Sequence, residues 1–204
     1  MKVCWSCEAQ LPEDANYCLR CGHSQADRTA SPIFVVDSNT ELFNAVFIKA
    51  MIGQETNRAV RYDRPFSVLV VEVDHAEHIH RNLGISQLNA LLKEIGQELV
   101  EAVRDTDTVG FLDADGPPHY AVVLPETDPS GGLLAADKIR RSVASHDFEA
   151  GGAWQRLTVS VAVASVVHER MQQQDLLREA YATLQAGLNS GQGPNRTYTA
   201  ALPV

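Results

Sequence analysis

The cysteines of this chain are the residues whose spacing most directly predicts chemistry. All four lie in the first 21 residues, as the pairs Cys4-x-x-Cys7 and Cys18-x-x-Cys21, with ten residues between the pairs. A Cys-x-x-Cys turn directs two thiolates at one point, and two such turns supply the four ligands of a tetrahedral Zn(II) site. Because the protein fills all four coordination positions, we expect the ion to be structural and not catalytic.

The cysteine segment, residues 1–25, resembles the short zinc ribbons found at the N-termini of bacterial proteins. So short a segment cannot bury a core, and the metal would supply its folding free energy. Disulfides are the alternative, although Cys-x-x-Cys pairs make poor structural bridges and the sequence shows no secretion signal. A ribbon that contacts DNA or RNA is a further alternative. Its support is limited to a few basic or histidine side chains: Lys2, Arg20, His23 and Arg28.

The composition limits the classes of function that the chain can have. Its 204 residues allow one ordinary domain plus a small module, and a hydrophobic content of 45% supports a core. The formal net charge of −9 argues against broad binding to nucleic acid or to an anionic membrane. No run approaches the roughly 18–20 apolar residues of a membrane span. The net charge disfavours nucleic acid as a partner, and the absence of targeting signals together with the use of cysteine predicts a cytoplasmic protein.

The elements that must position any site follow the cysteine segment. Residues 26–34 lack periodicity and predict a linker. We expect helices over residues 37–61, 85–103, 129–145 and 174–186, and strands over 66–73, 108–112, 120–124 and 157–166. Asp37 or Ser38 is the expected cap of the first helix. This order predicts an α/β (α+β) domain with a central, largely antiparallel sheet flanked by helices.

Short motifs follow one another across residues 35–200. They are Asp37-Ser-Asn-Thr40-Glu-Leu42, Glu55-Thr-Asn-Arg58-Ala-Val-Arg61, Pro65-Phe-Ser-Val-Leu69, Arg104-Asp-Thr-Asp107, Ala121-Val-Val-Leu-Pro125 and Leu157-Thr-Val-Ser-Val161. In this order and spacing they resemble the GGDEF domains, the family that makes cyclic di-GMP (c-di-GMP). The resemblance implies the nucleotide-cyclase-like fold. It also implies a possible homodimer, because GGDEF domains work in pairs.

Several positions that bind metal or nucleotide in active family members differ in this chain. The resemblance places Glu72-Val-Asp74 at the family's Asp-x-Asp strand end, which binds Mg(II). Glu72 keeps an oxygen ligand about one methylene further out, so residual metal binding and an acidic strand end facing solvent are both open. His80 aligns with the guanine-reading Asn and Asn89 with its partner Asp, which changes the groups offered to guanine. The family's phosphate-binding lysine falls near Gly187.

The hairpin that gives the family its name differs most from the residues of active family members. Counted backward from the strand over 120–124, its five positions hold no carboxylate: Gly116, Pro117, Pro118, His119 and Tyr120. Two-metal phosphoryl chemistry needs a carboxylate in this turn, and histidine is a poor ligand for a hard cation. Proline also has no amide hydrogen to donate to phosphate. We therefore expect neither Mg(II) binding nor catalysis here, unless Asp113 and Asp115 supply the missing carboxylates.

The Arg-x-x-Asp element is retained as Arg104 and Asp107. Many family members bind c-di-GMP at an inhibitory site through this element. A guanidinium pairs with phosphate or a guanine edge, and a carboxylate accepts hydrogen bonds from guanine. A surface ion pair at a helix end is the alternative interpretation.

A histidine cluster that follows the strand predicted over 66–73 is the remaining candidate for metal binding, since on a helix His75 and His78 could share a face. Its members are His75, His78 and His80, together with Glu77. Because the sequence fixes no third ligand, solvated histidines on a helix surface are the favoured interpretation.

Together these patterns predict a zinc ribbon over 1–25, a linker over 26–34 and a degenerate GGDEF domain over 35–204. Our first hypothesis is a non-catalytic signalling or scaffold protein whose ribbon docks a protein partner. The alternative is a c-di-GMP receptor that uses Arg104 and Asp107, and an active cyclase with unusual ligands is the third hypothesis. Structural Zn(II) is the expected cofactor.

Overall fold

The computed structural model describes residues 2–4, 9–13, 15, 17–18, 20, 35–112, 117–166, 173–191 and 193–199. The chain divides into two compact units, Met1–Phe34 and Val35–Val204, which are considered separately. Several sequence predictions lie outside the described residues. They concern Cys7, Cys21, the linker over 26–34, Asp113, Asp115 and Gly116.

The first unit contains a short β-hairpin beside two of the cysteines. Strand β1 (Lys2–Val3) pairs antiparallel with β2 (Gln10–Leu11), and the Cys4 amide then donates to the Ala9 carbonyl at 2.8 Å. Cys4 and Cys18 are both buried, in one small cluster with Leu11. The fold of this segment thus gathers the first cysteine of each pair.

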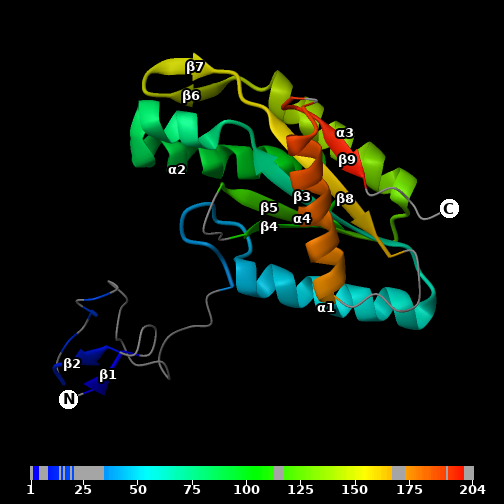
Figure 1. Ribbon diagram of the computed structural model, residues 1–204, viewed down its shortest axis with the longest axis horizontal. Coiled ribbons are helices and arrows are strands. Elements are labelled where there is room, and N and C mark those ends of the chain that lie inside the picture. The colour runs from blue at the N-terminus through cyan, green and yellow to red at the C-terminus, as the bar shows by residue number, and fades with distance from the viewer. Residues whose placement is uncertain are drawn as a thin grey trace. The chain divides into compact units, whose positions relative to one another are not determined.

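The second unit is built on a five-stranded sheet in the order β4-β5-β3-β8-β9 (Figure 1). Its strands are β3 (Phe66–Val73), β4 (Thr108–Leu112), β5 (His119–Pro125), β8 (Val159–Ser165) and β9 (Thr197–Thr199). All neighbours are antiparallel except β8 and β9. Central β3 is buried along almost its whole length, as its continuous apolar sequence predicts. The predicted largely antiparallel sheet is therefore confirmed.

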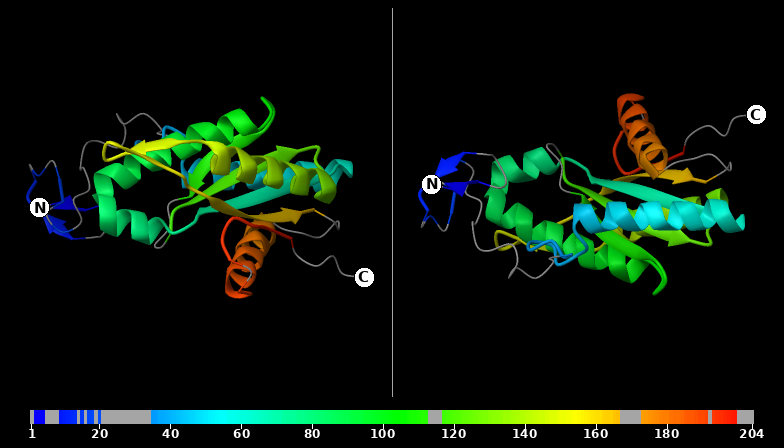
Figure 2. Two further views of the ribbon diagram at one scale, coloured as in Figure 1. Left: turned by 90° about the horizontal axis from the view of Figure 1, so that it is seen from above. Right: turned by 90° about the horizontal axis from the view of Figure 1, so that it is seen from below.

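Two helices cover each face of the sheet (Figure 2). Helices α2 (Ala76–Ala102) and α3 (Pro129–Ser145) share one hydrophobic core with it, and α1 (Ala45–Tyr62) and α4 (Gln173–Asn189) share the other. A small hairpin of β6 (Phe148–Ala150) and β7 (Ala153–Gln155) packs beside α2. Within the described residues, no helix combines the length and the apolar character that a bilayer span requires.

The first helix begins later than its sequence pattern predicts. Asp37 or Ser38 was the expected cap, but α1 starts at Ala45 and is capped by the Asn44 side chain. The Asp37 carboxylate instead accepts the amides of a turn. Glu41 follows in the left-handed region, at φ +62°, which no helix continues through. In the segment over residues 37–44, hydrogen bonds from side chains to the nearby backbone therefore replace the helix that the apolar periodicity predicted.

Other element boundaries differ from the sequence prediction where a helix is interrupted or a strand is very short. Helix α2 was expected over 85–103, yet it starts at Ala76 and is interrupted at Gly84, which has φ +80° and ψ +169°. Only the part after Gly84 has a regular apolar stripe, so only that part was predicted. Strands β6, β7 and β9 have three residues each and are too short for an alternating pattern to indicate them.

Candidate functional site

A histidine closes the strand end that the family resemblance assigns to Mg(II). Glu72 on β3 and His119 on β5 are direct cross-strand partners. The His119 Nε2 atom lies 2.9 Å from Glu72 Oε2, and the side chains are only 6% and 13% exposed, respectively. Glu72 therefore does not face solvent, which excludes one of its two sequence interpretations. Its carboxylate is already engaged by the imidazole.

The other side of the imidazole is enclosed as well. The His119 ring meets the Tyr181 ring of α4 edge to face, with centroids 5.2 Å apart. Burial, and secondarily the charge of Glu72, raises the pKa of Tyr181 to about 12. The His119 Nδ1 atom is buried without a hydrogen-bond partner. An imidazole and a phenol beside this carboxylate do not form the shell of carboxylate, carbonyl and water oxygens that Mg(II) prefers.

Asp74, the second carboxylate of this strand end, has a structural role. It is 6% exposed. Its oxygens accept from Thr158 Oγ1 at 2.6 Å, Ser160 Oγ at 2.7 Å and the Asn195 amide at 2.8 Å. These bonds join the end of β3 to β8 and to the segment before β9. No group of three His, Cys, Asp or Glu side chains able to hold a metal occurs in the part of the chain that the structure describes.

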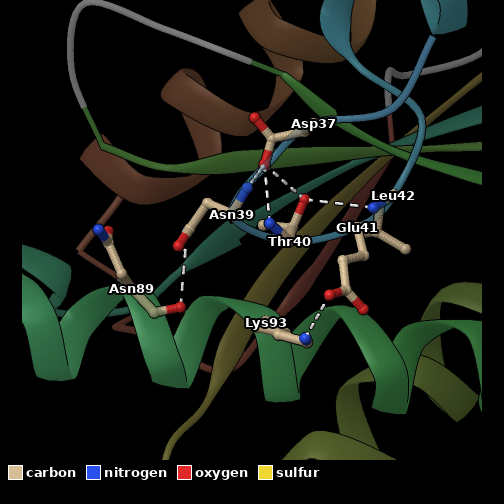
Figure 3. Close-up of polar contacts among 7 residues, drawn as sticks. All are labelled: Asp37, Asn39, Thr40, Glu41, Leu42, Asn89 and Lys93. Carbon is tan, nitrogen blue, oxygen red and sulfur yellow. Dashed lines mark hydrogen bonds and ion pairs between the residues drawn. The ribbon is translucent and has the colours of Figure 1, made fainter. Parts of the chain in front are cut away.

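The two predicted guanine-reading positions lie on α2 but differ in their surroundings. His80 is exposed, whereas Asn89 is half-buried under the loop over residues 37–42. The Asn89 carbonyl accepts the side-chain amide of Asn39 at 3.5 Å (Figure 3). The same loop is held to α2 by an ion pair of 2.6 Å between Glu41 and Lys93. The loop over residues 37–42 is therefore joined to α2 by a hydrogen bond to the Asn89 backbone and by the ion pair to Lys93.

Tyr120, which we predicted to be the last position of the hairpin signature, belongs to the core. It is fully buried, and its hydroxyl donates to the Leu92 carbonyl at 2.6 Å. Burial raises the pKa of this phenol far above its ordinary value. Its ring stacks edge to face on Phe111, with centroids 5.3 Å apart. Tyr120 thus stabilises the contact between β5 and α2.

The helix position near which the family carries a lysine has no room for a side chain. A Cβ added at Gly187 would lie 2.3 Å from Cδ1 of Tyr198. Tyr198 is 8% exposed, and its hydroxyl donates to the Gly193 carbonyl at 3.1 Å. The close approach of α4 to β9 therefore requires glycine here.

Arg104 and Asp107 lie together at the turn that links α2 to β4. The Asp107 carboxylate accepts the backbone amide of Arg104 at 3.0 Å. Within the described residues, the Arg104 guanidinium forms no ion pair, so the geometry does not support the alternative interpretation as a surface ion pair. Both residues line a cavity of about 410 Å³, whose walls include Leu42, Val103 and Val109. An exposed guanidinium beside an apolar wall is suited to a flat, anionic ligand.

The structure bears differently on the two predicted metal sites, the histidine cluster and the cysteines. The histidines of α2 form no metal-binding group among the described residues, and the His78 ring instead lies 3.2 Å from Asn82 Nδ2. In the first unit, the Arg20 amide donates to Cys18 Sγ at 3.4 Å. An amide hydrogen bond to sulfur favours a thiolate, which is the form that binds zinc.

Sequence reasoning missed the residues that complete these contacts. They come from α4, from β8 and the residue before it, and from the segment before β9: Tyr181, Ser160, Thr158 and Asn195. Only the strand register, counted from Glu72 opposite His119, would have indicated that a basic side chain meets the carboxylate.

A sheet with this strand order and two helices on each face defines a nucleotide-cyclase-like domain. Comparison with known protein families identifies the family to which the domain belongs. The sequence model of the protein family described as "Diguanylate cyclase, GGDEF domain" matches residues 34–194, so the chain belongs to the GGDEF domain family.

Individual relatives agree with this assignment. The diguanylate cyclase DosC of Escherichia coli is 28% identical over 130 residues, which cover 63% of this chain and 28% of DosC. The chain thus spans little more than a quarter of that relative's length. Two crystal structures share the fold. They are the FimX GGDEF domain of Pseudomonas aeruginosa (TM-score 0.74, 17% identity, 81% of this chain and 99% of that one) and the DgcB GGDEF domain of Caulobacter crescentus in complex with c-di-GMP (0.75, 16%, 87% and 99%).

Proposed function

We propose that this protein is a catalytically inactive GGDEF-domain protein that acts in c-di-GMP signalling as a scaffold for protein partners. One observation carries the proposal: the carboxylate at the metal-binding strand end is hydrogen-bonded to His119. Mg(II) demands a near-ideal octahedron of oxygen ligands and binds poorly to imidazole. To bind the ion, Glu72 would have to leave a buried partner and leave both polar atoms of that ring unsatisfied.

The rest of the nucleotide site supports the same proposal. The Asp74 carboxylate already accepts hydrogen bonds from three donors of the protein. Gly187 is held against Tyr198, so α4 offers no cation for a phosphate at that position. Pro117 and Pro118 supply no amide hydrogens to the hairpin. Transition-state stabilisation of phosphoryl transfer needs metal, charge and backbone donors together, and each is altered here.

The N-terminal unit is proposed as a zinc ribbon that serves as the docking module. Its ligands are Cys4, Cys7, Cys18 and Cys21. The common burial of Cys4 and Cys18 supports this ligand set, as does the amide hydrogen bond to the Cys18 sulfur. With four thiolates bound, the ion has only a structural role. We further propose a cytoplasmic location and, as for other members of the family, a homodimer as the working unit.

The decisive test is an assay of the full chain with GTP and MgCl2, analysed by chromatography for c-di-GMP. An active GGDEF domain under the same conditions is the positive control. We expect no product and no heat of GTP binding by calorimetry. Any c-di-GMP above the no-enzyme control would disprove the proposal. Zinc is measured separately, with one ion per chain expected and a content far below one refuting the ribbon.

A c-di-GMP receptor is the second candidate, and the Arg104 cavity is the observation that favours it. The guanidinium has no competing ion pair within the described chain, and the neighbouring Asp107 carboxylate can accept from a guanine edge. The test is calorimetric titration with c-di-GMP. Micromolar binding that is lost in Arg104→Ala and kept in Arg81→Ala, an exposed arginine of α2, would support the receptor. An absence of binding to the wild-type protein would exclude it.

A further inference from the structure

A groove lies between α4 and β9, at one edge of the sheet. The two elements run side by side there (Figures 1 and 2). The groove has a volume of about 490 Å³. Its α4 wall carries one acidic residue among small side chains: Glu179, Ala182, Thr183, Ala186 and Gly187. Its other wall is β9 itself. The groove is separate from the Arg104 cavity, and of its lining residues only Gly187 and Tyr198 enter the argument for the proposed function.

Two residues that line this groove each carry a buried polar atom without a partner in the described part of the chain. Within the described chain, three buried side-chain oxygen or nitrogen atoms have no hydrogen-bond partner, and two of them are Glu179 Oε2 and Thr197 Oγ1. Glu179 belongs to α4 and Thr197 to β9, and both residues line the groove. Buried polar atoms are nearly always satisfied in native proteins, so an orphaned pair indicates a missing partner. Burial also raises the pKa of Glu179, because desolvation disfavours its carboxylate. A positively charged donor would relieve that cost.

The second wall is the edge of the sheet. Strand β9 is last in the strand order and pairs only with β8 among the described strands. The Val161 amide donates to the Arg196 carbonyl, so backbone groups at Arg196 point toward β8. Because backbone direction alternates along a strand, the amide and carbonyl of Thr197 point toward the open edge. An edge of this kind is a template for another strand.

The α4 wall leaves space for the side chains of such a strand. Ala182 and Ala186 are four residues apart and therefore lie on one face of the helix, where both are exposed. Glu179 is the one charged residue among those that line the groove. The protein as a whole carries a formal net charge of −9. Shape and charge both favour an extended segment with a basic side chain.

We propose that the groove between α4 and β9 binds an extended segment of a protein partner, which pairs with β9 and places a Lys or Arg side chain against Glu179. Main-chain hydrogen bonds to the strand edge would provide affinity, and the Glu179 pocket would select the basic residue. The inference rests on the proposed scaffold function only in requiring a protein partner. It does not depend on the ribbon or on the absence of catalysis.

The test is selection of a displayed random peptide library on the full-length protein, with peptides of roughly seven residues to exceed a typical strand length. Ala186→Leu places a larger side chain in the groove from an exposed helix position, and Ala50→Leu on α1 is the matched control. We expect enriched peptides to contain Lys or Arg. They should bind the wild-type protein and Ala50→Leu, and should fail to bind Ala186→Leu. Peptides that bind Ala186→Leu equally, or no enrichment over that variant, would overturn the proposal.

The role of Glu179 is tested with one selected peptide by fluorescence anisotropy. Glu179→Gln keeps the shape of the side chain and removes its charge, so we expect affinity to fall by about tenfold or more. Replacing the basic residue of the peptide by norleucine should lower the affinity for the wild-type protein by a similar factor. The norleucine peptide should then bind Glu179→Gln with the same affinity as it binds the wild-type protein. Unchanged affinity in the variant would disprove the charge contact. A dimer dissociated by Ala186→Leu in sedimentation would instead identify a second copy as the occupant and overturn the proposal. Detection of c-di-GMP synthesis would end the scaffold proposal without affecting these measurements.

Discussion

Replacing Asp74 by alanine tests whether this carboxylate is structural. In the family resemblance it belongs to the metal-binding strand end, and removal of a carboxylate left over from catalysis would leave stability unchanged or improve it. In the structure, its two oxygens accept three hydrogen bonds of 2.6–2.8 Å from β8 and from the segment before β9. The substitution would leave three buried or half-buried donors without an acceptor.

The magnitude follows from those three bonds. A hydrogen bond to a charged group contributes about 1.5–3 kcal/mol, and water that enters the site recovers part of the loss. We therefore expect Asp74→Ala to lower the free energy of unfolding by about 3–5 kcal/mol, a large share of the roughly 5–15 kcal/mol of a typical domain. For a domain of this size, that corresponds to a fall in Tm of roughly 6–20 °C.

The assay is urea unfolding of the full chain, followed by far-ultraviolet circular dichroism, with Tm from a thermal scan. Asp74→Asn keeps the shape and one acceptor oxygen, so its loss should be about half as large. Asp105→Ala removes an exposed carboxylate from the turn between α2 and β4 and should stay within about 0.5 kcal/mol of wild type. If Asp74→Ala lies within about 1 kcal/mol of wild type, the structural role assigned to this carboxylate is wrong.

Four further predictions concern other parts of the molecule. Gly187→Ala should lower stability by about 1–3 kcal/mol, because the new Cβ would meet the Tyr198 ring at 2.3 Å; an unchanged Tm would contradict this packing. Tyr120→Phe should cost about 1 kcal/mol in urea unfolding, since it removes the bond to the Leu92 carbonyl. A strong chelator should release one zinc ion and abolish amide protection in the β1–β2 hairpin, while protection in the central sheet persists. Because burial raises the pKa of Glu179, binding of a basic peptide should weaken on acidification at a higher pH than for an ordinary glutamate, and Glu179→Gln should remove this dependence.

Much of the scaffold was predictable because its elements have strong local patterns. The continuous apolar run of β3 and the amphipathic repeat of α3 gave the boundaries observed, Phe66–Val73 and Pro129–Ser145. The start of α1 was not predictable from periodicity, since Asn44 and the turn built on Asp37 compete with the helix. Strand β9 has only three residues and exists because β8 offers it a parallel neighbour.

The sequence by itself determined the order of the long helices and strands, the family motifs and the pairing of the cysteines along the chain, and it predicted a hairpin signature without carboxylates. Each of these depends on residue type and on spacing along the chain. Only the tertiary structure decided what the retained polar residues do. Glu72 meets His119 across 47 positions of sequence, and Asp74 meets Ser160 across 86, because strand register brings them together. The groove beside β9 likewise exists only where α4 and the sheet edge meet. Such contacts between distant residues are set by the packing of whole elements, which local sequence patterns do not encode.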